Sequence, residues 1–150
     1  MPSIDEEIKS KFESDHQRAL VNVLFTANWL KNIHSDGLKK YDITTQQYNI
    51  LRILRGAKGW MAMNDVKGRM IEKSPNTTRL ADKLLKSEYI ERRRCDEDRR
   101  VVFVQITKKG LEFLKKMDTD KSFDLSKEFS KYITKKEAKK LSALLDQIRG

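Results

Sequence analysis

The chain has 150 residues, which suits one domain with a hydrophobic core and is short for two independent ones. Hydrophobic residues make up 38% and charged residues 36%, a balance that favours long helices with solvated faces over a β-sandwich. The formal net charge of +10 favours a polyanionic partner, and no apolar run approaches the roughly 20 residues that cross a bilayer, so we expect a cytoplasmic protein without a membrane partner.

The first predicted elements are helices. Apolar residues of segment 8–30 recur at steps of three and four, which indicates one long amphipathic helix that Gly37 ends. Thr44 is expected to be the N-cap of a second helix, and Gln47 is in position to complete a capping box. This second helix is expected to stop near Gly56 and Gly59, because two glycines in four residues favour a turn.

A short helix is predicted over residues 63–70, and the strongest helix start in the chain follows it. Ser74 is expected to be the N-cap of this next helix and Pro75 its first residue, because the N–H that proline lacks would have no partner at that position. Its outward face suits the major groove, where asparagine pairs with adenine edges and arginine with guanine edges. The candidate major-groove residues are Ser74, Pro75, Asn76, Thr78, Arg79 and Lys83. An ordinary solvated helix face has a similar composition, so the helix alone does not establish DNA binding.

A β-hairpin is predicted after this helix, because the strand-like segments 89–94 and 101–106 flank the charged segment 95–100. Its arms and tip carry the five arginines at positions 92, 93, 94, 99 and 100. An arginine on a narrow ribbon can enter the minor groove, where negative potential is concentrated, while its neighbours bind phosphates. The candidate DNA-binding residues of this wing are Arg92, Arg94, Asp98, Arg99 and Arg100.

Asp98 is the acidic exception among these residues. It lies two residues before Arg100, on the same side of an extended strand, and we expect it to orient the Arg100 guanidinium through a charge-assisted hydrogen bond. The alternative is a hairpin tip whose acidic and basic side chains neutralise each other in solvent.

Further helices complete the chain. Thr107 is expected to cap one of them, and Thr134 introduces a lysine-rich helix whose apolar stripe runs over residues 138–148. This stripe and the one over residues 8–30 are too extensive for helices that lie on one small domain, so we expect them to pair between subunits. The sequence therefore predicts a homodimer.

A series of short motifs, in this order and spacing, resembles the MarR family of winged helix-turn-helix transcriptional regulators. They are Ser74-Pro75-Asn76-Thr77-Thr78-Arg79-Leu80, Leu84-Leu85, Tyr89-Ile90-Glu91-Arg92, Asp98-Arg99-Arg100 and Ile106-Thr107-Lys108-Lys109-Gly110. Upstream, residues 43–54 resemble the first helix of that family's DNA-binding domain. The resemblance spans residues 43–110, and the flanking helices match by pattern only.

The resemblance implies a mainly α fold with a small β-hairpin wing. Residues 1–36 would form an N-terminal dimerisation helix, residues 37–110 the winged helix-turn-helix domain, and residues 111–150 the C-terminal dimerisation helices of one intertwined domain. The helix over residues 74–87 would enter the major groove of DNA, and Arg100 the adjacent minor groove.

Such a protein binds double-stranded DNA, and a pseudo-palindromic operator would match the homodimer. Members of the family usually repress genes until a small aromatic or phenolic effector, or an oxidant, changes the spacing of the two DNA-binding heads. Their effector-binding residues vary, so those of this chain are unknown. The alternative function is a winged helix that binds proteins or shapes DNA without operator specificity.

The sequence offers no set of residues from which a catalytic site can be constructed. It has no Ser/His/Asp set, no glycine-rich phosphate loop and no spaced cluster of carboxylates and histidines. We therefore expect neither an enzyme nor a cofactor. The single cysteine, Cys95, excludes an internal disulfide, and together with His16 and His34 it supplies too few ligands for a structural zinc site.

Several other side chains have both a functional and a structural interpretation. Neighbouring arginines favour a reactive thiolate at Cys95, but the peroxide-sensing cysteine of the MarR family lies in the N-terminal helix, so we interpret Cys95 as incidental. His16 and His34 either bind a ligand and respond to pH or are solvated or hydrogen-bonded, and we favour the second interpretation. Trp29 and Trp60 are expected to serve packing rather than to line a ligand pocket.

Overall fold

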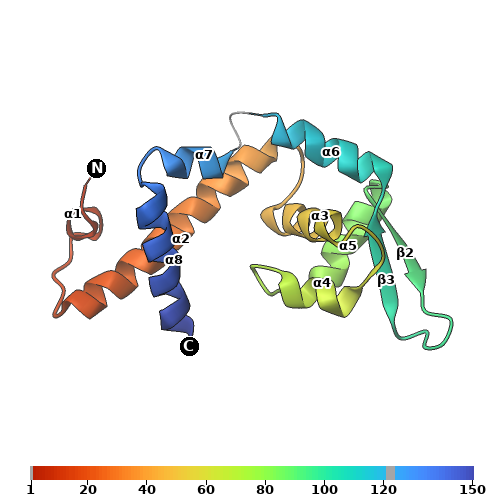
Figure 1. Ribbon diagram of the computed structural model, residues 1–150, viewed down its shortest axis with the longest axis horizontal. Coiled ribbons are helices and arrows are strands. Elements are labelled where there is room, and N and C mark those ends of the chain that lie inside the picture. Colours follow the sequence, from red (N-terminus) through yellow and green to blue (C-terminus); the bar gives the residue numbers. More distant parts are fainter. Residues whose placement is uncertain (1, 121–123) are drawn as a thin grey trace.

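The computed structural model describes residues 2–120 and 124–150. Its helices and strands follow the chain in the order α1 (Ile4–Ile8), α2 (Asp15–Lys39), α3 (Thr45–Ala57), β1 (Met61–Ala62), α4 (Met63–Arg69), α5 (Thr77–Lys86), β2 (Ile90–Arg94), β3 (Val102–Ile106), α6 (Lys108–Asp118), α7 (Leu125–Ser130) and α8 (Lys135–Arg149). The strands and α3 to α6 gather at one end of the molecule, whereas α1, α2, α7 and α8 lie at the other (Figure 1). The predicted mainly helical fold with a β-hairpin is confirmed.

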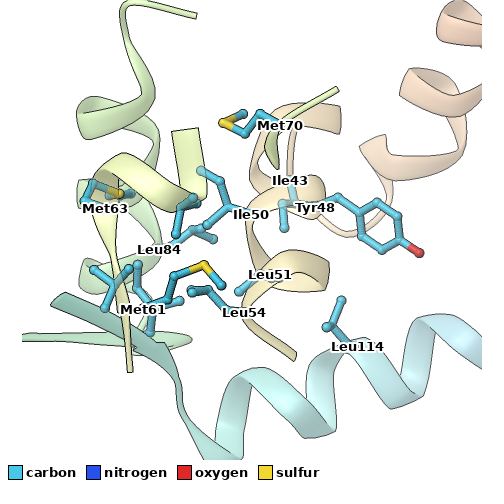
Figure 2. Packing of buried hydrophobic residues seen from close by; sticks show 14 of the residues in the cluster. Ile43, Tyr48, Ile50, Leu51, Leu54, Met61, Met63, Met70, Leu84 and Leu114 are labelled. Carbon is cyan, nitrogen blue, oxygen red and sulfur yellow. The ribbon is translucent and has the colours of Figure 1, made fainter. Parts of the chain in front are cut away.

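The hydrophobic core lies at the end of the molecule that contains the sheet. Ile50, Leu51 and Leu54, all on one face of α3, are fully buried. Figure 2 shows them within a cluster that also includes Leu84 of α5 and Leu114 of α6. Burying an aliphatic side chain of this size stabilises a fold by about 1.5–3 kcal/mol. The cluster therefore fixes α5 and the sheet relative to α3.

The N-terminal helix differs from the sequence prediction at both ends. The stripe over residues 8–30 is not one helix, because α1 ends at Ile8 and α2 begins only after Ser14, whose hydroxyl accepts a hydrogen bond from the Gln17 N–H. At the other end α2 continues through Gly37 and buries Leu38 completely. That burial outweighs the cost of about 1 kcal/mol for glycine inside a helix. Within the described ranges, no helix is both long and apolar enough to span a membrane.

Two helix starts are capped as the sequence predicts. Thr44 Oγ1 accepts from the Gln47 N–H at 3.1 Å, and the Gln47 side chain accepts from the Thr44 N–H at 3.0 Å, which completes the capping box. Thr107 Oγ1 accepts from the Gly110 N–H at 3.1 Å and starts α6. Both caps are local, because each joins residues three positions apart. They set where α3 and α6 enter the core.

The sheet has one strand more than the predicted hairpin. β2 and β3 pair antiparallel as expected, and β1 pairs with the other side of β3 to give the order β1-β3-β2. In this register Met61 lies opposite Val104, and both side chains are buried in the core. A strand of two residues has no periodicity that a sequence pattern can reveal. β1 anchors the wing to the segment that follows α3.

Candidate nucleic-acid interface

The helix α5 starts later than the sequence predicts. Its first residue is Thr77 and its N-cap position is Asn76, so the prediction of Ser74 as N-cap and Pro75 as first helical residue is wrong. Ser74 instead closes a turn, because its hydroxyl accepts from the Asn76 N–H at 3.1 Å and its carbonyl accepts from the Thr77 hydroxyl at 2.8 Å. Thr77 is 1% exposed, so burying it against the core leaves Ser74 and Pro75 in the preceding turn.

The faces of α5 separate as the sequence predicts. Ala81 and Leu84 are buried against the core, and the candidate residues point away from it. Pro75, Asn76, Thr78, Arg79 and Lys83 are exposed, and Ser74 is half-buried. Steps of three and four residues place Asn76, Arg79 and Lys83 along one ridge of the helix. This ridge offers one amide and two cations to a polyanion.

The arginines of the wing lie on both faces of the sheet. Successive side chains of a strand point to opposite faces, so Arg92 and Arg94 share one face and Arg93 takes the other. The guanidinium of Arg92 lies 3.3 Å from Asp82 of α5, and that of Arg94 donates to the Arg99 carbonyl at 3.3 Å. Arg93 instead stacks on Trp60, with its guanidinium carbon 4.5 Å from the ring centroid. The arginines therefore do not form one basic surface.

The tip of the wing is a turn, not the extended strand on which the role of Asp98 was predicted. The Val101 N–H donates to the Asp98 carbonyl at 2.9 Å, and the Arg100 N–H donates to Asp98 Oδ1 at 3.0 Å. The Arg100 Nε lies 3.6 Å from the same carboxylate oxygen, which is an ion pair but longer than a hydrogen bond. Asp98 thus holds the backbone of Arg100, whose side chain is 95% exposed. Arg99 is also exposed.

A groove separates α5 from the wing. It has a volume of about 230 Å³ and is lined on one side by Thr78 and Asp82 of α5 and on the other by Arg92 and Arg100. Asn64 and Lys67 of α4 add polar groups, and the apolar lining includes residues of α5 and β3. The Asp82–Arg92 ion pair crosses this groove. The sequence alone does not single out Asp82, because no local pattern reveals a contact between two separate elements.

The other singled-out side chains serve packing or are exposed. The ring of His34 meets that of Tyr48 edge-on with centroids 5.4 Å apart, and burial, followed by the positive charge of Arg52, lowers the pKa of His34. His16 is exposed, and Cys95 is half-buried at the base of the wing tip. Among the described residues, no group of three or more histidine, cysteine or acidic side chains is arranged to hold a metal ion.

Comparison with known proteins identifies both a family and similar folds. The family described as "Transcriptional regulator SarA/Rot" matches residues 32–117. The transcriptional repressor MprA of Escherichia coli K12 is 52% identical over 42 residues, which are 28% of this chain and 24% of MprA. The chain therefore matches about a quarter of the length of that relative.

Two solved structures illustrate the structural likeness. The MarR transcription factor from Planctomyces limnophilus is 28% identical with a TM-score of 0.67, and the match covers 93% of this chain and 98% of that one. A mutant of MarR from E. coli, solved in complex with operator DNA, is 24% identical with a TM-score of 0.74. That match covers 98% of this chain and 99% of MarR, and it shows a shared fold.

Proposed function

This chain belongs to the SarA/Rot family of transcriptional regulators, and from that premise we propose that it recognises a specific operator with α5 in the major groove and the wing in the minor groove. The fold is that of the MarR-type winged helix, a DNA-binding fold. The observation that carries the proposal is the groove flanked by two DNA-compatible elements. On one side lies the ridge of Asn76, Arg79 and Lys83, and on the other lies the exposed Arg100.

In the proposed complex α5 reads base edges. Asn76 is the N-cap of α5 and Arg79 lies in its first turn, and the N-terminal residues of a recognition helix are the ones that reach the bases. Lys83 lies one turn later and suits a phosphate. Ser74 and Pro75 precede this first turn and Thr78 lies within it, and all three would set its distance from the DNA backbone.

The wing contributes a shape-dependent contact in this proposal. Arg92 and Arg100 both form ion pairs in the wing, and Arg100 is the more exposed of the two. It projects from a turn that Asp98 holds in place. A narrow A·T-rich minor groove concentrates negative potential, so it is the expected target of this guanidinium. Arg94 and Arg99 lie beside it and would bind the flanking phosphates.

We propose that the operator is bound by a homodimer. The part of the chain away from the sheet exposes large apolar side chains, namely Leu20, Val23, Leu24, Phe25, Trp29, Ile33, Phe129, Tyr132, Leu141, Leu144 and Ile148. An apolar surface of this kind favours a second copy as its partner, and a two-fold dimer would require a pseudo-palindromic operator. The proposed dimerisation segments are residues 1–36 and 111–150, with α6 as the connection, because its Leu114 and Met117 belong to the core.

Repression and release by an effector are the finer parts of the proposal. The similar protein MprA is named a transcriptional repressor, which supports repression here. Release by a small aromatic or phenolic effector rests on the MarR resemblance of the sequence motifs. Regulation, rather than catalysis, is the assignment that the family supports. The competing function is an architectural or protein-binding winged helix without operator specificity.

Selection of bound sequences from a random pool of duplex DNA tests the proposal. We expect the purified full chain to enrich one pseudo-palindromic sequence with A·T-rich flanks, and Arg79→Ala to relax the preference mainly at the base pair that Arg79 faces. Binding without enrichment of any sequence would favour the architectural function. Failure to bind duplex DNA at low salt would overturn the proposal as a whole.

A further inference from the structure

The face of the sheet that points away from the core carries side chains that the proposed DNA contacts leave out. In the register of the sheet, Arg93 of β2 lies opposite Phe103 of β3, which lies opposite Ala62 of β1. Trp60 lies two residues before Ala62 and so shares its face. The guanidinium carbon of Arg93 is 4.5 Å from the ring centroid of Trp60 and 5.8 Å from that of Phe103.

This arrangement ties an edge strand of the sheet to the core. The strand order β1-β3-β2 places β2 at an edge of the sheet, where its backbone is bonded to β3. The Arg93 side chain reaches past β3 to Trp60, which lies three residues after the end of the core helix α3. A cation held over two aromatic rings resists rotation of β2 about β3, because such a rotation would break both contacts. The wing is therefore tied to the core from its outer face.

Because side chains alternate between the two faces along β2, the position of Arg93 determines the direction of Arg92 and Arg94. With Arg93 held on the outer face, Arg92 and Arg94 must point to the face that lines the groove. Arg94 donates to the carbonyl of Arg99, the residue before Arg100, at 3.3 Å. A chain of contacts thus runs from Trp60 through Arg93 and its neighbour Arg94 to the wing tip.

We propose that Arg93 is a positioning residue for DNA binding: it stays off the DNA and, by bridging Trp60 and Phe103, holds the wing at the angle that presents Arg100 to the minor groove. This inference rests on the proposed function, in which the wing binds DNA. The competing role for Arg93 is that of one more phosphate-binding cation. That role requires the side chain to leave the aromatic rings on binding.

A double-mutant cycle separates these two roles. In the full chain, Arg93→Ala is expected to weaken operator binding about three- to tenfold and to flatten the preference at the A·T flanks, with the central base preferences unchanged. In the Arg100→Ala background, Arg93→Ala is expected to have almost no further effect, because the contact that it positions is already lost. Equal losses in both backgrounds would overturn the proposal and favour a direct phosphate contact.

Trp60 supplies a second variant that carries no charge. Trp60→Leu is expected to reproduce the affinity loss of Arg93→Ala, and the two changes together should cost no more than either alone. Gln105→Ala is the matched control, because Gln105 lies on the same outer face and bonds Glu91 instead of reaching Trp60. It is expected to bind DNA like the wild type. Trp60→Leu with wild-type affinity would overturn the positioning role.

Fluorescence and stability complete the test. Arg93→Ala should change the tryptophan emission of the free protein, and this change should vanish in the Trp60→Leu background. Thermal unfolding must show that each variant is folded at the assay temperature, because a general loss of folded protein would lower the affinity for every sequence by the same factor and leave the base preferences unchanged. If Arg100→Ala itself leaves operator binding unchanged, the proposed wing contact fails. If only Arg93→Ala is without effect, the positioning role alone fails.

Discussion

Asp82 of α5 and Arg92 of β2 form an ion pair, with 3.3 Å between Asp82 Oδ1 and Arg92 Nη1, across the groove that separates α5 from the wing. Both side chains are half-exposed, so the pair contributes little to folding, on the order of 0–1 kcal/mol. In the proposed complex, we expect a larger effect on DNA binding. The pair places a negative charge between two cationic surfaces and occupies a guanidinium that would otherwise be available to a phosphate.

The change Asp82→Ala should therefore strengthen binding to random duplex DNA, by about three- to tenfold at low salt, because it removes a repulsive charge and frees Arg92. Operator binding should gain less, so specificity should fall. Affinities for operator and random duplex over a salt series measure both effects. Asp36→Ala removes the same charge from α2 and should change neither affinity. Weaker binding by Asp82→Ala to random duplex would mean that the ion pair holds Arg92 in a DNA-binding position.

For Asp98 we predict the opposite effect on DNA affinity to that of Asp82. Because its carboxylate accepts the Arg100 N–H at 3.0 Å, Asp98→Ala should loosen the wing turn and weaken operator binding about three- to tenfold, although it removes a negative charge. Asp98→Asn keeps an acceptor oxygen and should bind at least as tightly as the wild type. Fluorescence anisotropy with labelled operator measures both variants. Tighter binding by Asp98→Ala would leave Asp98 as a solvated wing residue.

Gly110 tests the junction between the wing and α6. A Cβ at this position would lie 2.2 Å from the backbone oxygen of Tyr89 and 2.7 Å from the Ile106 side chain. The same Tyr89 oxygen accepts the Thr107 N–H at 3.0 Å, so it cannot move without cost. Gly110→Ala should lower the free energy of unfolding by about 1–3 kcal/mol or more.

Gly68 is the matched control for that change. A Cβ there would meet no described atom within 4 Å, and Gly68 lies inside α4. Gly68→Ala should therefore leave the free energy of unfolding unchanged or raise it by up to about 1 kcal/mol. Urea unfolding followed by circular dichroism measures both variants. Equal stability of the two variants would contradict the close approach of α6 to Tyr89.

The hydrogen bond of Tyr41 is expected to make the stability of the fold depend on pH in the alkaline range. Its hydroxyl donates to Asp120 Oδ2 at 2.5 Å, and this hydrogen bond, followed by burial and the charge of Asp120, raises the pKa of Tyr41 to about 12. A tyrosine with an ordinary pKa near 10 in the unfolded chain ionises there first. The stability from this bond is thus fully present below about pH 10 and is lost as the pH rises to about 12.

The variant Tyr41→Phe isolates this effect. The wild type should be more stable than Tyr41→Phe at pH 8, and the difference should shrink between about pH 10 and pH 12, because phenylalanine does not ionise. Thermal unfolding of both proteins across that range measures the difference. A difference that stays constant up to pH 12 would show that the bond to Asp120 does not raise the pKa.

The features that the sequence predicted are those with local causes. The capping box of Thr44 and Gln47 and the cap at Thr107 join residues three positions apart, so a short motif suffices to reveal them. The buried face of α5 follows from its helical period, and the hairpin follows from alternation. The positions of Asn76, Thr78, Arg79 and Lys83 on the exposed face were therefore predictable.

The errors arose where tertiary packing overrides a local preference. Burial of Leu38 carries α2 through Gly37, and burial of Thr77 keeps the favourable helix-start pair Ser74 and Pro75 out of α5. The contacts that join separate elements, Asp82 with Arg92 and Arg93 with Trp60, leave no trace in spacing. Two neighbouring arginines with different roles look identical in a sequence.

The apolar stripe of α8 gives a prediction about assembly. Leu141, Leu144 and Ile148 are 41%, 48% and 70% exposed and lie on one face at steps of three and four residues. We expect light scattering to return twice the chain mass of 17.6 kDa at micromolar concentration. Changing Leu144 and Ile148 together to Asp should produce a monomer, because two charges cannot be buried unpaired in an apolar interface. A dimer that survives this change would exclude α8 from the interface.

The matched control changes Lys136 and Lys139 to Ala. Both residues lie on the opposite, exposed face of α8, and the double change alters the net charge by −2, as the double Asp variant does. This control should remain a dimer and bind the operator normally. The monomeric variant should bind the operator at least about a hundredfold more weakly, because one head no longer raises the local concentration of the other. If the monomer kept full operator affinity, recognition would require only one winged helix, and the operator selected from a random pool would be a single half-site without a palindrome.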